Sequence, residues 1–177
     1  MLPDRPSVHT LQALGISEKK AETKARLDFN RYRNMINKVL PDIVDNANDI
    51  ELIQWNTLEK EKSYQDALNE LQILYDTNTP FRSDVEEECV RMLRNNKANT
   101  YDALGEAERR QRIGHAVQFL LMELACVLSA PKTLQKEKVL YLYHRPMVVM
   151  QKLLEGAYDG KTRDNVGSFV YREFTEE

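Results

Sequence analysis

The residue of this 177-residue chain that is best placed to do chemistry is Glu123, because it lies in a strongly apolar stretch. Its neighbours one helical turn away are Phe119 and Val127, and residues four apart share a helix face. An isolated carboxylate is costly to bury, so this side chain must be paired, protonated or directed into a pocket. Two interpretations follow: a structural carboxylate bonded to a backbone amide or an arginine, and an acid that contacts a substrate.

A second candidate is the adjacent phenol and imidazole of Tyr143 and His144. They follow a β-branched and aromatic run over residues 138–143, which is typical of a buried strand, and they precede a helix that starts at Arg145-Pro146. Ligands of open α/β sheets bind outside the carboxyl ends of the strands. The pair could transfer protons or orient a substrate; alternatively, the tyrosine packs in the core and the histidine caps the helix.

A third feature is the basic surface of a long helix expected over residues 17–40. One row has lysine or arginine every seven residues, with a further lysine one turn earlier, and a parallel row lies about 100° away around the helix. The residues are Lys20, Lys24, Arg31 and Lys38 in the first row and Lys19, Arg26 and Arg33 in the second. Such a surface attracts phosphates with strong salt dependence, although interspersed acidic residues also fit an ordinary solvated surface.

Composition excludes several classes of protein and site. Lys and Arg number 25 against 28 Asp and Glu, so the chain as a whole is not a basic nucleic-acid binder. Cys89 and Cys126 make neither a disulfide framework nor a metal quartet. His9 and His115 are isolated in the sequence and are interpreted as surface or satisfied core residues. No His, Cys, Asp or Glu cluster has metal-ligand spacing, so no metal site is expected, and no glycine-rich phosphate loop is present.

The most apolar run, over residues 113–130, carries His115, Gln118 and Glu123 and is predicted to be a buried helix rather than a membrane span. No signal peptide is recognisable at the start of the chain. We therefore expect a cytoplasmic protein that does not enter a membrane.

The elements that must position these residues alternate between helices and strands. Pro41 and Pro131 are expected to end two of the helices. Helices are predicted over residues 7–14, 17–40, 59–76, 80–95, 106–128 and 145–154, strands over 49–55, 138–143 and 167–174, and a loop over 96–104. This alternation favours a single α/β domain over residues 1–177, with a thin, mostly parallel sheet flanked by helices.

The order and spacing of these segments resemble the tRNA-dependent cyclodipeptide synthases over nearly the whole chain. The most specific parts are the helix that runs from Phe119 to Glu123 and the strand-end sequence from Val139 to Pro146. The other matching segments are residues 2–15, the basic helix over 19–40, the run that begins at Tyr64 and the Phe81-Arg-Ser-Asp-Val sequence.

The resemblance implies a Rossmann-like fold similar to the catalytic domain of class Ic aminoacyl-tRNA synthetases. It implies an aminoacyltransferase that takes two aminoacyl-tRNAs as substrates and needs no cofactor. In that family a serine carries first an aminoacyl and then a dipeptidyl ester, and the dipeptide closes to a 2,5-diketopiperazine, a product of secondary metabolism.

The resemblance also assigns roles to residues of this chain. Glu123 matches the glutamate that holds the substrate α-amino group, Tyr143 the strand-end tyrosine of the active site, and His144 the histidine beside it. The basic helix matches the surface that receives tRNA. Phe119 stands where the family has a tyrosine that shares the amino-group contact, and phenylalanine cannot form that hydrogen bond.

A larger departure is that the family's first strand, with its Gly–hydrophobic–Ser nucleophile motif, and the helix after it have no counterpart here. We therefore expect the chain to be incomplete at its N-terminus and impaired in cyclodipeptide synthesis as given. The alternative is a non-catalytic tRNA-binding module derived from the same fold.

Overall fold

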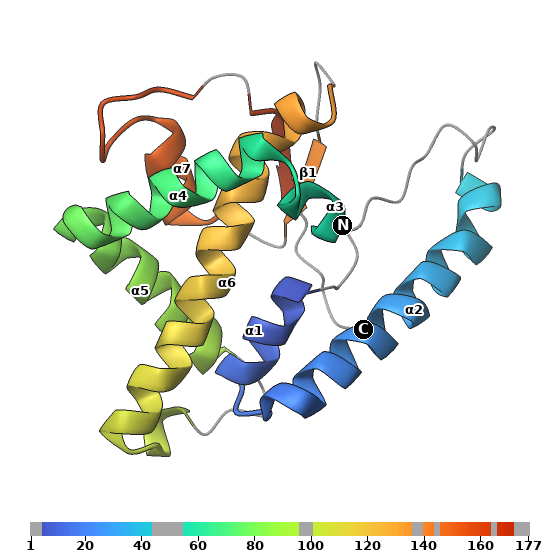
Figure 1. The fold of residues 1–177 in the computed structure, drawn as a ribbon, viewed down its shortest axis with the longest axis horizontal. Helices are drawn as coiled ribbons and strands as arrows, with labels where there is room; N and C mark the ends of the chain where they lie inside the picture. The colour runs from blue at the N-terminus through green and yellow to red at the C-terminus, as the bar shows by residue number, and fades with distance from the viewer. Residues whose placement is uncertain are drawn as a thin grey trace.

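The computed structural model describes residues 5–43, 55–95, 101–135, 140–143, 146–163 and 166–171, and most of these are helical (Figure 1). The elements in chain order are α1 (Arg5–Ala13), α2 (Glu18–Ile43), α3 (Trp55–Glu59), α4 (Lys62–Thr77), α5 (Thr79–Arg94), the 3-10 turn η2 (Tyr101–Ala103), α6 (Glu106–Thr133), β1 (Leu140–Tyr143), α7 (Val148–Leu154) and β2 (Ser168–Tyr171).

Helix α6 is the centre of the structure, as its apolar run predicted. It packs against α4, α1 and α5, and its buried side chains include Leu120, Leu121 and Leu124. By length and composition α6 could cross a membrane, but 61% of its most apolar stretch is buried within the described structure. This burial matches the predicted core helix.

Two predicted helix ends are wrong. Helix α6 continues through Pro131 to Thr133, and α2 continues through Pro41 to Ile43. A proline in the last turn removes only one hydrogen bond of the helix, and the amide of Leu134 still caps α6 by donating to the Ala130 carbonyl at 2.8 Å.

The helix predicted over residues 59–76 is confirmed as α4 from Lys62 onward, whereas its first residue, Glu59, ends the separate helix α3. Lys60 and Glu61 form a turn between them, with the Glu61 amide donating to the Leu58 carbonyl. The strand predicted over 49–55 is wrong at Trp55, which begins α3, because its period-two pattern gives way there to helix formers such as Leu58 and Glu59. Residues 49–54 lie outside the described residues.

Strands β1 and β2 pair in parallel, with Leu140 opposite Ser168 and Tyr143 opposite Tyr171. They lie inside the predicted strands 138–143 and 167–174, so both strands and their parallel pairing are confirmed. The sheet of the described residues contains these two strands, and the broader Rossmann-like sheet stays a prediction. Of the predicted loop over 96–104, residues 101–103 form η2 and 96–100 lie outside the described residues.

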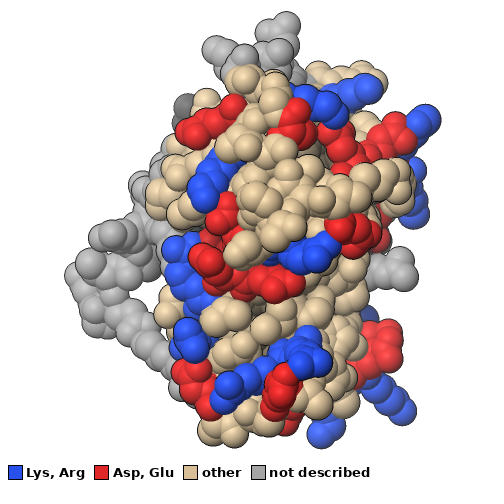
Figure 2. Space-filling view, turned by 90° about the vertical axis from the view of Figure 1, so that its left-hand side faces the viewer, with Lys and Arg blue, Asp and Glu red and all other residues tan. Residues whose placement is uncertain are grey.

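The basic helix α2 lies along one side of the molecule, and its main packing partner among the described elements is α1 (Figure 1). Its buried residues there are Ala21 and Ala25, one turn apart. The face of the molecule on the opposite side from α2 intermixes acidic and basic side chains without a large area of either sign (Figure 2).

Helix α1 ends in a glycine turn that directs the chain into α2. The Gly15 amide donates to the Gln12 carbonyl at 2.8 Å and the Ile16 amide donates to the Leu11 carbonyl at 3.0 Å, while Gly15 has φ of +84°. This is a C-terminal cap that glycine adopts without strain. The Arg112 guanidinium of α6 lies against the same glycine, 2.5 Å from where a Cβ would stand.

We expect Gly15→Ala to lower the free energy of unfolding by about 1–2 kcal/mol, because a left-handed conformation costs a residue with a Cβ about this much. The Arg112 side chain would also have to move. Urea denaturation measures the change. Gly114→Ala is the matched control: beyond the backbone of its own helix, no atom of the described residues lies within 4 Å of the added Cβ, so in mid-helix it should stabilise by about 0.5–1 kcal/mol. Equal effects of the two substitutions would contradict the prediction.

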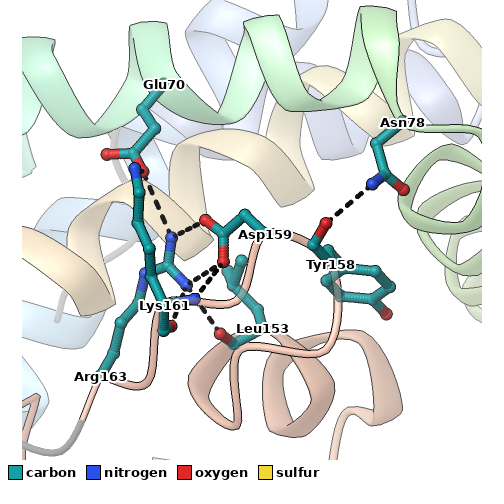
Figure 3. Close-up of polar contacts among 7 residues, drawn as sticks. All are labelled: Glu70, Asn78, Leu153, Tyr158, Asp159, Lys161 and Arg163. Carbon is teal, nitrogen blue, oxygen red and sulfur yellow. Dashed lines mark hydrogen bonds and ion pairs between the residues drawn. The ribbon is translucent and has the colours of Figure 1, made fainter.

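The segment after α7 is folded back onto α4 by Arg163 (Figure 3). Its guanidinium is 13% exposed and pairs with Asp159 at 2.6 Å and with Glu70 of α4 at 3.3 Å. It also donates to the carbonyls of Leu153 and Lys161 at 2.9 and 2.8 Å. The hydrogen bond from Arg163 holds the pKa of Asp159 below its ordinary value. One cation therefore joins the end of α7, the following segment and α4.

Tyr158 ties the same segment to α5. The Asn78 side chain accepts from the Phe81 amide at 2.8 Å, which caps α5, and donates to the Tyr158 carbonyl at 2.9 Å. The Tyr158 hydroxyl donates to Asp84 at 2.5 Å, and Lys152 pairs with the same carboxylate at 2.8 Å. Burial acts to raise the pKa of Asp84, but these two hydrogen bonds outweigh it and hold the pKa below its ordinary value.

Candidate functional site

The candidate site begins with a row of residues on α6. His115, Phe119 and Glu123 follow one another at intervals of four, so they lie along one side of the helix. All three are half-buried, whereas Leu120 and Leu124 are buried. The side chains on this side of α6 are therefore partly exposed to solvent, as a residue that contacts a substrate must be.

The Glu123 carboxylate affects the pKa of a neighbouring cysteine thiol. Burial raises the pKa of the Cys126 thiol to about 12, and the Glu123 carboxylate adds to this increase. Burial likewise raises the pKa of Cys89 to about 12, with Glu86 contributing. Both cysteines are buried thiols outside any disulfide, and at neutral pH they stay protonated and behave as small hydrophobic side chains.

Tyr143 is the last residue of β1, at the carboxyl end of a parallel pair, which is where a ligand-contacting residue is expected. Its side chain and the whole of His144 lie outside the described residues. The meeting of Glu123 with Tyr143 and His144 therefore stays a prediction.

The six predicted tRNA contacts are all exposed on α2. They are Lys20, Lys24, Arg26, Arg31, Arg33 and Lys38. Lys24 pairs with Asp28 one turn later at 2.8 Å, which offsets part of its charge. The helix therefore presents both predicted basic rows to the solvent.

The sequence Gly15-Ile16-Ser17 has the residue types of the nucleophile motif that the resemblance describes, but it is not in a strand. It forms the turn between α1 and α2, and the Ser17 carbonyl accepts from the Ala21 amide at 2.8 Å. Ser17 directly precedes α2, and its carbonyl accepts a hydrogen bond from the first turn of the helix, as at an N-cap position.

Two surface cavities were not predicted. One of about 510 Å³ is lined by α5 and α6 residues such as Glu87, Arg91 and Ile113, and one of about 400 Å³ is lined by residues that include Ser63, Lys132 and Arg163. The first is lined by residues 83–95 together with Ile113, whereas the second joins residues 63–70, 128–132 and 162–166, which no local motif could bring together. No predicted site residue lines either cavity, and the described residues hold no His, Cys, Asp or Glu group suited to a metal.

Comparison with solved structures shows the fold to which this arrangement belongs. A cyclodipeptide synthase from Bacillus thermoamylovorans superposes with a TM-score of 0.76 at 19% identity, covering 94% of this chain and 70% of that one. AlbC, a cyclodipeptide synthase from Streptomyces noursei, gives 0.67 at 15% identity, covering 95% and 76%. A Mycobacterium tuberculosis protein gives 0.70 at 14% identity, covering 93% and 66%, and is described as relating cyclodipeptide synthetases to type I tRNA synthetases.

Sequence comparison gives the same family. A cyclo(L-leucyl-L-leucyl) synthase of Bacillus subtilis is 25% identical over 180 residues, covering 99% of this chain and 70% of that protein. A synthase of the same name from Photorhabdus laumondii is 21% identical over 165 residues, covering 93% and 70%. The family model described as cyclodipeptide synthase matches residues 1–173. The chain therefore belongs to the cyclodipeptide synthases, an enzyme family that makes cyclodipeptides from aminoacyl-tRNAs.

Proposed function

We propose that this chain binds aminoacyl-tRNA and takes part in aminoacyl transfer to a cyclodipeptide. The observation that carries the proposal is the set of exposed lysine and arginine side chains on α2, in a chain whose formal charge is −3. An acidic protein attracts RNA only where cations are concentrated, and α2 provides that concentration.

The roles of the site residues follow from their chemistry. The Glu123 carboxylate binds the α-ammonium group of the aminoacyl ester through a charge-assisted hydrogen bond. Tyr143 and His144, which follow one another at the end of β1, orient the ester and relay protons. Phe119 adds an apolar wall beside Glu123 but no second hydrogen bond to the ammonium group.

Ester transfer through aminoacyl-enzyme and dipeptidyl-enzyme intermediates needs a nucleophile. Two described serines are already engaged elsewhere: the Ser63 hydroxyl lies 2.6 Å from that of Thr133, and Ser129 donates to the Cys126 carbonyl at 3.4 Å. Ser17 lies in a turn rather than at a strand end. None of the described serines stands in a Gly–hydrophobic–Ser sequence at the end of a strand, so we expect the 177-residue chain to bind aminoacyl-tRNA and to form little cyclodipeptide.

The test compares binding of leucyl-tRNA with binding of the same tRNA without its amino acid, because both curated relatives are named as leucyl-leucyl synthases. Tighter binding of the aminoacylated form supports a site for the aminoacyl group. Binding that ignores the amino acid would instead support the non-catalytic tRNA-binding module. Absence of binding to either form would overturn the proposal.

The double substitution Arg31→Ala with Lys38→Ala should weaken tRNA binding and reduce the slope of log Kd against log salt by about 1.4–1.8, since each lost phosphate contact removes about 0.7–0.9. Both residues are exposed, and neither is Lys24, which is already paired with Asp28. Fluorescence anisotropy over a salt series measures the slope. Lys62→Ala, an exposed lysine of α4, is the control. An unchanged slope would mean that α2 does not contact the RNA.

A further inference from the structure

Helix α2 carries exposed apolar side chains as well as its basic rows. Leu27 is 60%, Tyr32 44% and Met35 50% accessible to solvent. Among the described residues, the other large apolar side chains with comparable exposure are Ile73 of α4 and Val148 of α7. Exposed apolar groups therefore concentrate on the same helix as the predicted tRNA contacts.

Tyr32 lies on the side of α2 that packs against α1 nearer the start of the helix. Ala21, Ala25 and Tyr32 follow at intervals of four and seven, which keeps them on one side of a helix. The two alanines are buried against α1, but α1 has 9 residues and α2 has 26, about 13 Å against about 39 Å. Figure 1 shows α2 continuing well past α1, so the tyrosine ring stands where α1 cannot cover it.

Arginines flank this ring along the helix. Arg31 and Arg33 are both exposed. Consecutive residues of a helix are about 100° apart around its axis, so one arginine lies on each side of Tyr32. An aromatic ring between two guanidinium groups suits a nucleic-acid base, because the base can stack on the ring while the phosphates beside it bind the cations.

Two other occupants fit this surface less well. A membrane requires one continuous apolar face, but Leu27 and Tyr32 are about 140° apart around α2, and Arg31 stands between Leu27 and Met35 in their row. Pairing with a second copy of the chain through this surface would set the same cations against each other. RNA supplies both the bases and the negative charge that the surface can bind.

We propose that Tyr32 stacks on an unpaired base of the bound RNA, so that α2 selects RNA with a single-stranded segment over fully paired RNA. The inference rests on the proposed function, in which α2 receives tRNA. Bases inside a duplex are stacked on their neighbours, whereas unpaired bases can turn out onto an aromatic side chain. The end of a tRNA that carries the amino acid is single-stranded, so the proposed substrate contains such bases.

Two RNA hairpins with the same stem test the proposal, one blunt and one with a short unpaired 3′ overhang. By fluorescence anisotropy at a fixed salt concentration, the full chain should bind the overhang hairpin about 10-fold more tightly, as expected for one stacked base. Tyr32→Leu keeps an apolar side chain without the ring and should remove this difference, whereas Tyr32→Phe should retain it. The salt dependence should not change in Tyr32→Leu, because no phosphate contact is lost. Ile73→Ala, an exposed side chain of α4, is the control.

Each contrary result has a distinct meaning. Equal binding of the two hairpins by the wild type, or an undiminished difference in Tyr32→Leu, overturns the stacking and leaves tRNA binding by α2 standing. An equal loss for both hairpins in Tyr32→Leu also overturns it, because the ring would then support the helix rather than contact a base. Binding to neither hairpin overturns the stacking, and if tRNA also fails to bind, the proposed function fails with it. Binding to phosphatidylserine vesicles that is lost in Tyr32→Leu, without a difference between the hairpins, would show that the surface contacts membranes instead.

Discussion

Arg163→Ala is expected to lower the free energy of unfolding by about 3–5 kcal/mol, the usual cost of removing one partner of a buried ion pair. The substitution removes a guanidinium that is 13% exposed and leaves the Asp159 carboxylate, 14% exposed, without it. The carbonyls of Leu153 and Lys161 also lose a donor. Urea denaturation at neutral pH measures the loss.

Two variants control this experiment. Arg163→Lys keeps the charge but cannot make the forked contacts, so it should recover only part of the loss. Arg110→Ala removes an exposed arginine, 77% accessible, that pairs with Glu106, and should cost less than about 0.5 kcal/mol. A loss below about 1 kcal/mol for Arg163→Ala would show that the segment after α7 is held by other contacts.

The same cluster makes stability depend on pH in the acid range. Because the folded pKa of Asp159 lies below its ordinary value, its contribution is complete above about pH 4, the usual unfolded pKa, and is lost as the pH falls through the folded value. In Arg163→Ala this contribution is absent. The stabilities of wild type and variant should therefore approach each other as the pH is lowered.

Glu123→Gln should reduce the preference for aminoacylated over uncharged tRNA by about 10–100-fold, because a hydrogen bond to a charged group contributes about 1.5–3 kcal/mol. Glutamine keeps the size of the side chain and removes the negative charge that we propose pairs with the α-ammonium group. Binding of uncharged tRNA should not change, since the basic residues of α2 are untouched. Parallel anisotropy titrations with the two forms of the tRNA give the preference.

Glu106→Gln is the matched control, an exposed glutamate in the first turn of the same helix. A further variant, Phe119→Tyr, supplies the hydroxyl that phenylalanine lacks beside Glu123. It should raise the preference when Glu123 is present and have little effect in the Glu123→Gln background. A preference that survives Glu123→Gln would remove this residue from the amino-group site.

Most helices could be predicted because local patterns define them. The apolar run of α6, the Asn78-Thr-Pro start of α5 and Gly15 each specify structure through neighbouring residues. The C-terminal ends of α2 and α6 could not be predicted. Proline disfavours helix but does not forbid it, and the last turn of a helix loses little stability when it contains a proline. The strand predicted over residues 49–55 wrongly includes Trp55, because the alternation of apolar and polar residues before it does not extend beyond that residue.

For the candidate site, sequence patterns indicated the half-buried Phe119 and Glu123 and the exposed bases of α2. They did not indicate contacts between distant segments. His9 and His115 look isolated in the sequence and meet only because α1 docks on α6. Arg163 likewise joins Glu70, 93 residues away, and no local spacing signals that pair.

The direction of α2 relative to the rest of the described structure depends on the methyl side chains of two alanines. Ala21 and Ala25 are 0% and 4% exposed, where longer side chains would hold the helix axes farther apart. The charges of α2 project elsewhere, toward solvent. The packing of these two alanines thus sets the direction of α2, whereas the exposed charges take no part in that packing. Replacing an exposed lysine or arginine should therefore change the charge of the helix without moving its axis.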